Sequence, residues 1–188
     1  MQLAFKNSFY GGKFDGIYGL GITFRNWLNG DFNSKAHVEL VFHVTPAMIK
    51  LLQQKHQNQF LTLKPGDAVS YSSIETDKNE LGQDVHGCRF KQISYINYDR
   101  WDFLNWNIHD KRFPKQWPTV ETLFLYCLGR VGVVGYDWEG IGGQALGNHA
   151  IDNSTKTFCS EEIAELMGIM DNPNPSRLYN KVCAILKS

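Results

Sequence analysis

The chain has 188 residues, a length that predicts one domain spanning residues 1–188 with a sizeable buried core. Lys plus Arg equals Asp plus Glu at 19 each, a balance that argues against a nucleic-acid binder, which usually carries a basic face. Met1–Leu20 lack the pattern of a signal peptide, and no segment approaches the length of a membrane span. We therefore expect a soluble protein, either cytoplasmic or delivered by a phage.

The first half of the chain is mainly strand-like. In chain order, the patterns predict a short helix over Ile22–Leu28, a strand over Ala36–Val44, a helix over Thr45–Leu52 with Thr45 as its N-cap, and strands over Ala68–Glu75, Cys88–Ile93 and residues 94–104. The Ala36–Val44 strand alternates strictly, with an apolar face and a second face that carries His37, Glu39, Val41 and His43.

The second half is mainly helical. We expect a helix from Pro118 to about Gly129, a Gly-rich loop over Val131–Gly147, a helix around Cys159 that stops at Gly168, and a last helix over Ser176–Leu186. Strands followed by helices predict an α+β fold: a small, mainly antiparallel sheet or partial barrel with helices packed on it.

Cys159 is the first candidate functional residue. It precedes Ser160 and two acids in the first turn of its predicted helix, where Thr157 or Ser160 can serve as the cap. A thiol at a helix N-terminus lies near unpaired N–H groups and the positive end of the helix dipole. Both favour the thiolate, which is the nucleophilic form.

A nucleophilic thiol needs a base, and His37 is the best candidate. Glu39 lies two residues further along the same strand face and suits the role of an acid that orients the imidazole. Ser72 is the runner-up for that role, with Ser70 and Glu75 as further alternatives on the next strand. Tyr136, in the Gly-rich loop, could line the site or donate a hydrogen bond to an oxyanion.

The cysteines do not suggest a metal site or a cofactor. Cys88, Cys127, Cys159 and Cys183 show no Cys-x-x-Cys spacing. His37 and His43 are six residues apart on a strand, roughly 20 Å, too far to share one ion. Cys127 and Cys183 fall in apolar helical segments, where buried inert thiols are expected.

Three short segments together resemble a known family. They are His37-Val38-Glu39-Leu40-Val41, Gly135-Tyr136-Asp137 and Phe158-Cys159-Ser160-Glu161-Glu162. In content and order they are similar to the circularly permuted branch of the NlpC-type papain-like cysteine peptidase superfamily, which includes YiiX-like hydrolases and lecithin–retinol acyltransferase-like proteins. Ordinary members place the cysteine helix before the histidine strand, whereas here His37 comes first.

The resemblance implies a permuted papain-like topology with Cys159 as nucleophile and His37 as base. It also implies a cysteine hydrolase that forms a thioester and acts on a peptide, a peptidoglycan fragment or an acyl substrate. Two other functions stay open: a non-catalytic binding or virion-type module that keeps the fold, and a thiol acyltransferase on lipid-like substrates.

Overall fold

The structure is a computed structural model. It describes residues 1–10, 13–14, 34–55, 60–78, 84–93, 100–137, 156–170 and 174–188. The helix predicted over Ile22–Leu28 lies outside these residues.

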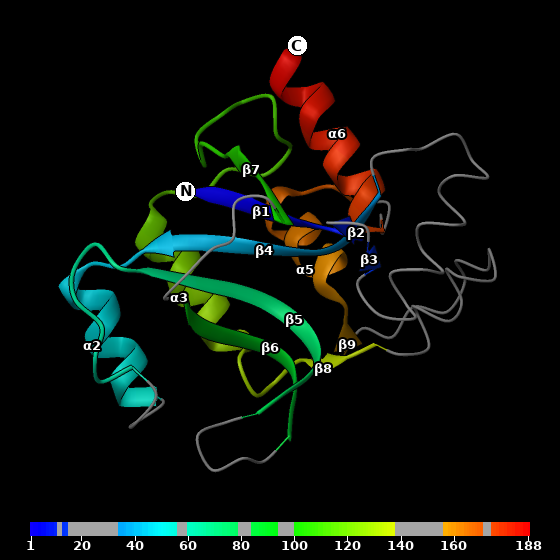
Figure 1. The fold of residues 1–188 in the computed structure, drawn as a ribbon. Coiled ribbons are helices and arrows are strands. Elements are labelled where there is room, and N and C mark those ends of the chain that lie inside the picture. The colour runs from blue at the N-terminus through cyan, green and yellow to red at the C-terminus, as the bar shows by residue number, and fades with distance from the viewer. Residues whose placement is uncertain are drawn as a thin grey trace.

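Five antiparallel strands form the main sheet, in the order β6-β5-β4-β1-β7 (Figure 1). Their bounds are β1 (Gln2–Asn7), β4 (Lys35–His43), β5 (Ala68–Lys78), β6 (Asp84–Ile93) and β7 (Trp101–Asn105). Two smaller sheets have two residues per strand: β2 (Phe9–Tyr10) with β3 (Lys13–Phe14), antiparallel, and β8 (Gly135–Tyr136) with β9 (Lys156–Thr157), parallel. Within the described residues the main sheet does not close into a barrel. The predicted α+β fold with a mainly antiparallel sheet is therefore confirmed in its open-sheet form.

Four helices accompany the sheet in the part of the chain that the structure describes. They are α2 (Pro46–Lys55), α3 (Val120–Arg130), α5 (Cys159–Met167) and α6 (Pro175–Lys187). Helix α5 packs on β4 and β5, α6 packs on β4, and α3 packs on β6 (Figure 1). None of the helices in the described segments is long and apolar enough to cross a bilayer.

The core lies between the sheet and the helices α3 and α5. Alternate residues of β4 face it, among them Leu40 and Phe42, both fully buried. The ring of Phe42 packs 5.4 Å from that of Phe124 on α3, and Phe124 packs 4.9 Å from Phe90 on β6. The alternation predicted for the Ala36–Val44 strand is therefore the alternation that builds the core.

Most predicted elements are present, with shifted ends. Thr45 caps α2 as expected, since its hydroxyl accepts a hydrogen bond from the Met48 N–H at 3.3 Å. Strand β6 starts four residues before the predicted Cys88, at Asp84. Strand β1 was not predicted, although it is a central strand of the sheet. The predicted loop around Tyr136 contains the short strand β8.

An irregular start of β4 positions the residues of interest. Its register with β1 shifts between Lys6↔His37 and Asn7↔Lys35, so Ala36 is an extra, bulged residue. Because of the bulge, Lys35 turns to the same side as Asn7 and donates a hydrogen bond to its side chain at 2.6 Å. His37 is thus the first residue of the regular part of β4.

Strands β4 and β5 separate near this start. Their register runs from His43↔Ala68 to Leu40↔Tyr71, and within the described residues it does not extend to His37. Where the backbone pairing of β4 and β5 stops, two serines of β5 form hydrogen bonds through their side chains. Ser72 donates to the Val38 carbonyl at 2.8 Å, and Ser73 donates to the Thr157 carbonyl of β9 at 2.7 Å. The Ser73 bond therefore holds β9 against β5, and α5, which follows β9, packs on β4 and β5.

Candidate active site

Cys159 is the first residue of α5. The predicted caps Thr157 and Ser160 are wrong, because the N-cap is Phe158, which has extended backbone angles. The Glu161 carboxylate accepts a hydrogen bond from the Phe158 N–H at 3.3 Å, which supplies the acidic half of a capping box. Ser160 lies inside the helix, and its buried hydroxyl has no hydrogen-bond partner among the described residues.

The end of α5 is as predicted. Gly168 adopts φ +76°, and its N–H donates to the Glu165 carbonyl while the Ile169 N–H donates to that of Ala164. This pair of bonds is a Schellman motif, which favours glycine at this position. The helix therefore spans the segment that was expected, with its thiol at the N-terminal end.

The short β8–β9 ladder places Tyr136 near this end of α5. Tyr136 is in register with Thr157, two residues before Cys159, and the Asp137 N–H donates to the Thr157 carbonyl at 3.2 Å. Tyr136 is half-buried and Asp137 is buried. The oxyanion role suggested for Tyr136 stays a prediction.

His37 and Cys159 come together across 122 residues of sequence. Cys159 lies close enough to His37 to influence the charge of its ring. Burial of His37 opposes its charged form, but the charge and hydrogen bond of Cys159, followed by those of Glu39, outweigh burial and raise the His37 pKa from 6.5 to about 9. The imidazolium is therefore the favoured form near neutral pH.

Glu39 also contacts the His37 ring. Its Oε1 is 3.3 Å from the His37 Nε2, as expected for two residues on the same strand face. Burial would raise the Glu39 pKa, but the hydrogen bond and charge of His37, the charge of Arg89 and a hydrogen bond with Ser70 lower it from 4.5 to about 2. Glu39 is thus a buried carboxylate held in its ionised form.

The other candidates for the orienting role have different positions. Ser70 acts on Glu39, whose pKa it helps to lower. Ser72 donates its hydroxyl hydrogen bonds to the carbonyls of Val38 and Ser73. The side chain of Glu75 lies outside the described part of the structure. Of the three candidates whose side chains the structure describes, Glu39 is therefore the one that lies against the His37 ring.

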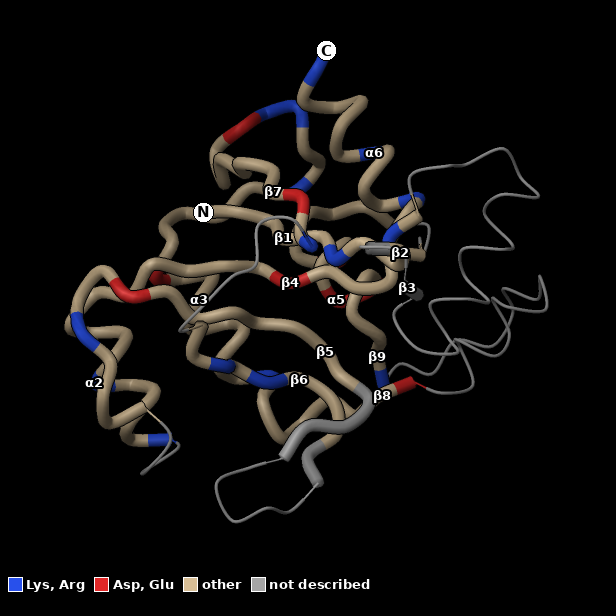
Figure 2. The backbone as a smooth tube through the Cα atoms, in the orientation of Figure 1, with Lys and Arg blue, Asp and Glu red and all other residues tan. Residues whose placement is uncertain are grey.

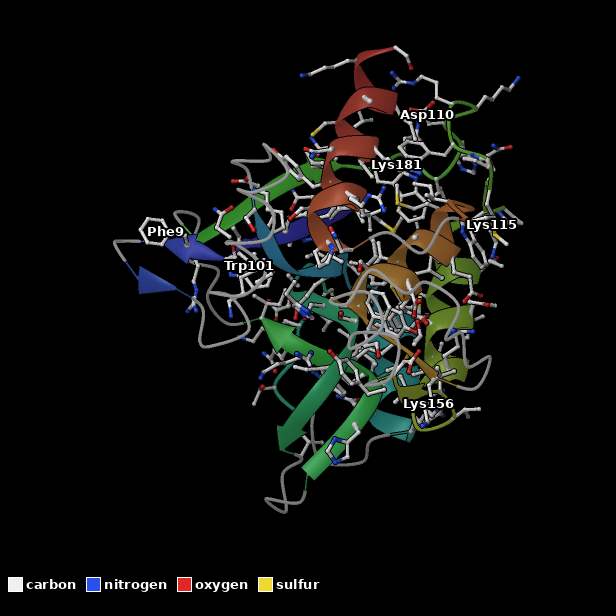
Figure 3. All side chains as sticks on the ribbon, turned by 90° about the vertical axis from the view of Figure 1, so that its right-hand side faces the viewer. Phe9, Trp101, Asp110, Lys115, Lys156 and Lys181 are labelled. Carbon is white, nitrogen blue, oxygen red and sulfur yellow. The ribbon has the colours of Figure 1, made fainter. Side chains whose placement is uncertain are left out.

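Two further residues contact this group, and the sequence analysis did not single them out. Arg89 on β6 donates to the same Oε1 of Glu39 at 3.4 Å. Trp101 on β7 packs edge-to-face against His37, with ring centroids 6.3 Å apart, at the end of the sheet where β4 begins (Figure 3). Neither residue belongs to a motif, and only the strand register brings them to His37.

The site is largely buried. Cys159 is 6 % exposed, and the side chains of His37 and Glu39 are 19 % and 13 % exposed. The most accessible of the three is the imidazole, so we infer that a reagent approaches the sulfur from the His37 side. A cavity of about 700 Å³ lies elsewhere, lined by Trp106, Ile108 and neighbouring residues, and Cys159 and His37 do not line it.

A second buried group anchors α5. Glu162 is fully buried and accepts hydrogen bonds from Tyr71 on β5 at 2.6 Å and from Arg130 on α3 at 2.7 Å. Arg130 also pairs with Glu165 at 3.1 Å. The helix that carries Cys159 is thereby tied to both the sheet and α3.

The other cysteines differ from Cys159. Burial raises the pKa of Cys88 to about 12, and burial raises that of Cys127 well above its ordinary value. Both are buried thiols, as expected for Cys127, whereas Cys183 is only half-buried, so the prediction that it is buried is wrong. Within the described residues, no cluster of three or more His, Cys, Asp and Glu side chains could hold a metal ion.

Comparisons with known proteins find no match: no family model fits the chain, and neither the curated proteins nor the solved structures contain one similar to it.

Proposed function

We propose that the protein is a cysteine hydrolase in which Cys159 is the nucleophile, His37 the general base and Glu39 the residue that orients the imidazole. The observation that carries this proposal is the 3.3 Å contact between the His37 Nε2 and the Glu39 Oε1, together with the influence of Cys159 on the charge of the same ring. Nucleophile, base and orienter in this sequence are the arrangement that activates a thiol.

The ground state is a thiolate–imidazolium pair. Since Nε2 of His37 faces Glu39, Nδ1 is the ring nitrogen left for the sulfur. The raised pKa of His37, about 9, means that the ring keeps its proton near neutral pH. The first N–H groups of α5 have no carbonyl partner within the helix and are available to stabilise negative charge at this end.

In the acylation step, the Cys159 thiolate attacks the carbonyl carbon of an amide or ester and forms a C–S bond. The carbonyl oxygen becomes an oxyanion, which the Cys159 N–H can stabilise, with Tyr136 as a second candidate donor. As the tetrahedral intermediate collapses, the C–N or C–O bond breaks and His37 gives its proton to the leaving amine or alcohol. A thioester and a neutral imidazole remain.

In the deacylation step, the neutral His37 takes a proton from water, whose oxygen attacks the thioester carbon. Collapse of this second intermediate breaks the C–S bond and releases the carboxylic acid. The thiolate and the imidazolium are restored, so protons and charges balance over the cycle.

The resemblance to permuted NlpC-type peptidases supports the same assignment. The order is that of the permuted branch: the histidine strand β4 comes before the cysteine helix α5. On this proposal the fold has a permuted papain-like topology, and the substrate is a peptide, a peptidoglycan fragment or an acyl ester. An acyltransferase would share the first step and pass the acyl group to an acceptor other than water.

One observation favours a second candidate function. Cys159 is only 6 % exposed, which suits a binding module that keeps the fold without turnover. The two candidates differ in what they require of the sulfur, because a binding module needs no reactive thiolate.

The rate of Cys159 alkylation tests the proposal. Iodoacetamide is added between about pH 5 and pH 9, and the modified peptides are quantified by mass spectrometry. Cys183 on α6, which is half-buried, serves as an internal reference in the same molecule. We expect Cys159 to stay reactive at the acidic end of the range, where Cys183 does not react.

Two variants complete the test. His37→Gln should abolish the reaction of Cys159 at acidic pH, and Cys159→Ala should abolish hydrolysis of any amide or acyl ester that the parent cleaves. A parent Cys159 that follows the pH dependence of Cys183, with no turnover on peptides, peptidoglycan fragments or acyl esters, would support the binding module instead.

A further inference from the structure

We propose that Arg89 is a positioning residue of the candidate active site. It binds the Glu39 oxygen that faces His37 and thereby lowers the affinity of the imidazole ring for its proton. The catalytic meaning of this inference rests on the proposed function, whereas the contact between Arg89 and Glu39 does not depend on it.

Arg89 reaches Glu39 from two strands away. Its backbone is in register with Ser72 of β5, and β5 lies between β6 and β4. Figure 2 shows the two ends of this contact as basic positions on β6 and an acidic position on β4. Neighbouring strands are about 4.8 Å apart, so the guanidinium crosses roughly 10 Å over β5. Only a long side chain can do this.

The residues of β5 under this crossing are small. Ser72 is fully buried, and its hydroxyl points to the Val38 carbonyl at 2.8 Å. Ser70, the next residue on this face of β5, helps to lower the pKa of Glu39. Large side chains at these two positions would occupy the space through which Arg89 passes. The serines considered as orienters of His37 therefore make room for Arg89 and support Glu39.

Two donors share one oxygen of Glu39. His37 Nε2 lies 3.3 Å from Oε1, and Arg89 Nη2 lies 3.4 Å from the same atom. The Arg89 side chain is 9 % exposed and that of Glu39 is 13 % exposed, so solvent screens this group weakly. The guanidinium compensates part of the carboxylate charge and repels a second cation beside it, and both effects destabilise the imidazolium.

Charged groups face His37 from several elements. Cys159 approaches from α5 and Glu39 from β4, and both favour the protonated ring. Lys6 of β1 is in register with His37 and adds a positive charge. Arg89 differs from Lys6 because it shares the Glu39 oxygen that His37 uses. Its removal leaves Glu39 to His37 and Ser70.

This balance matters for catalysis because His37 must release its proton as well as hold it. An imidazolium paired with two uncompensated anions, Cys159 and Glu39, is a weak acid toward a leaving group. With Arg89 present, the group of four side chains has two positive and two negative charges and no excess negative charge.

The test is an NMR titration of the His37 ring protons, assigned by their absence in a His37→Gln variant. Arg89→Met keeps the length and apolar stem of the side chain and removes its charge. We expect the His37 titration midpoint to rise by about one pH unit in Arg89→Met and to stay near the parent value in Arg89→Lys. Lys91→Met is the matched control, because Lys91 is an exposed residue of the same strand, and it should leave the midpoint unchanged.

An unchanged or lowered midpoint in a folded Arg89→Met protein would overturn the inference. If that variant does not fold, Arg89→Gln provides the same comparison with a polar side chain, and the same rise is expected. The titration does not depend on turnover, so it separates the two proposals. If the alkylation of parent Cys159 follows the pH dependence of Cys183, the hydrolase proposal is refuted. If Cys159 is alkylated rapidly but Arg89→Met leaves the His37 midpoint unchanged, only the role of Arg89 is refuted.

Discussion

The His37 Nε2 lies 3.3 Å from the Glu39 Oε1, and the two residues are separated by a single position on β4. A strand holds residues i and i+2 on one face without help from any loop. The proposed base and its proposed orienting acid are therefore positioned by local backbone geometry, and only Cys159 must be brought to them by the fold.

The His37–Glu39 contact makes stability depend on pH in opposite directions. The Glu39 pKa in the folded protein, about 2, lies below its ordinary value of 4.5, so its contribution is present above pH 4.5 and is lost as pH falls toward 2. The His37 pKa, about 9, lies above its ordinary 6.5, so its contribution is full below pH 6.5 and is lost as pH rises through 9.

We therefore expect the parent to exceed His37→Gln in free energy of unfolding most clearly below pH 6.5, with the difference shrinking up to pH 9. Urea unfolding of both proteins across this range measures the difference. A gap that grows with rising pH would contradict the raised pKa.

Glu39→Gln and Ser72→Ala separate the two leading candidates for the orienting role. Glu39→Gln keeps the shape of the side chain and removes its charge, so we expect the alkylation rate of Cys159 near neutral pH to fall at least about tenfold. Ser72→Ala removes a hydrogen bond to the Val38 carbonyl and should cost about 1 kcal/mol of stability, with the alkylation rate preserved. The reverse pattern would assign the role to Ser72.

The buried ion pair under α5 predicts a large stability effect. Arg130→Met leaves the fully buried Glu162 carboxylate without its cation, and the expected loss is about 3–5 kcal/mol. Tyr71→Phe removes a single hydrogen bond to the same carboxylate and should cost about 1.5–3 kcal/mol. Chemical denaturation measures both losses, and an Arg130→Met loss no greater than that of Tyr71→Phe would show that the pair is not the main anchor of α5.

Gly66 and Gly87 form a matched pair for testing close backbone approach. Both have φ +93°, so an alanine at either position is strained by about 1–3 kcal/mol. A Cβ at Gly66 would meet nothing within 4 Å, whereas one at Gly87 would lie 2.1 Å from the Val134 carbonyl oxygen. We expect Gly87→Ala to lower the melting temperature well beyond Gly66→Ala, and equal losses would show that strain alone acts at both sites.

Local patterns in the sequence predicted the site residues that depend on a single element. Strict alternation identified the face of β4 that carries His37 and Glu39, and Gly168 marked the end of α5. The N-cap was misplaced because Phe158 has no capping side chain, and the acid that caps the helix, Glu161, lies three residues further on. Sequence preferences for Ser and Thr caps do not report this arrangement.

Features that depend on pairing between distant strands were not predicted. Arg89 appeared as an ordinary strand residue because only the β5–β6 register directs it over Ser72. Strand β1 was missed even though Leu3 and Phe5 are fully buried and alternate with Gln2 and Lys6, because six residues at the start of a chain are a short pattern. A search for alternation from the first residue would have found it.

The position of β1 has a consequence for how the molecule assembles. This strand precedes β4 and β7 in the sequence, yet it lies between them in the sheet. Contacts between segments so distant in sequence form slowly, and β7 has β1 as its neighbour in the sheet. Deleting β1 would therefore detach β7 from the sheet, and with it Trp101, which packs against His37.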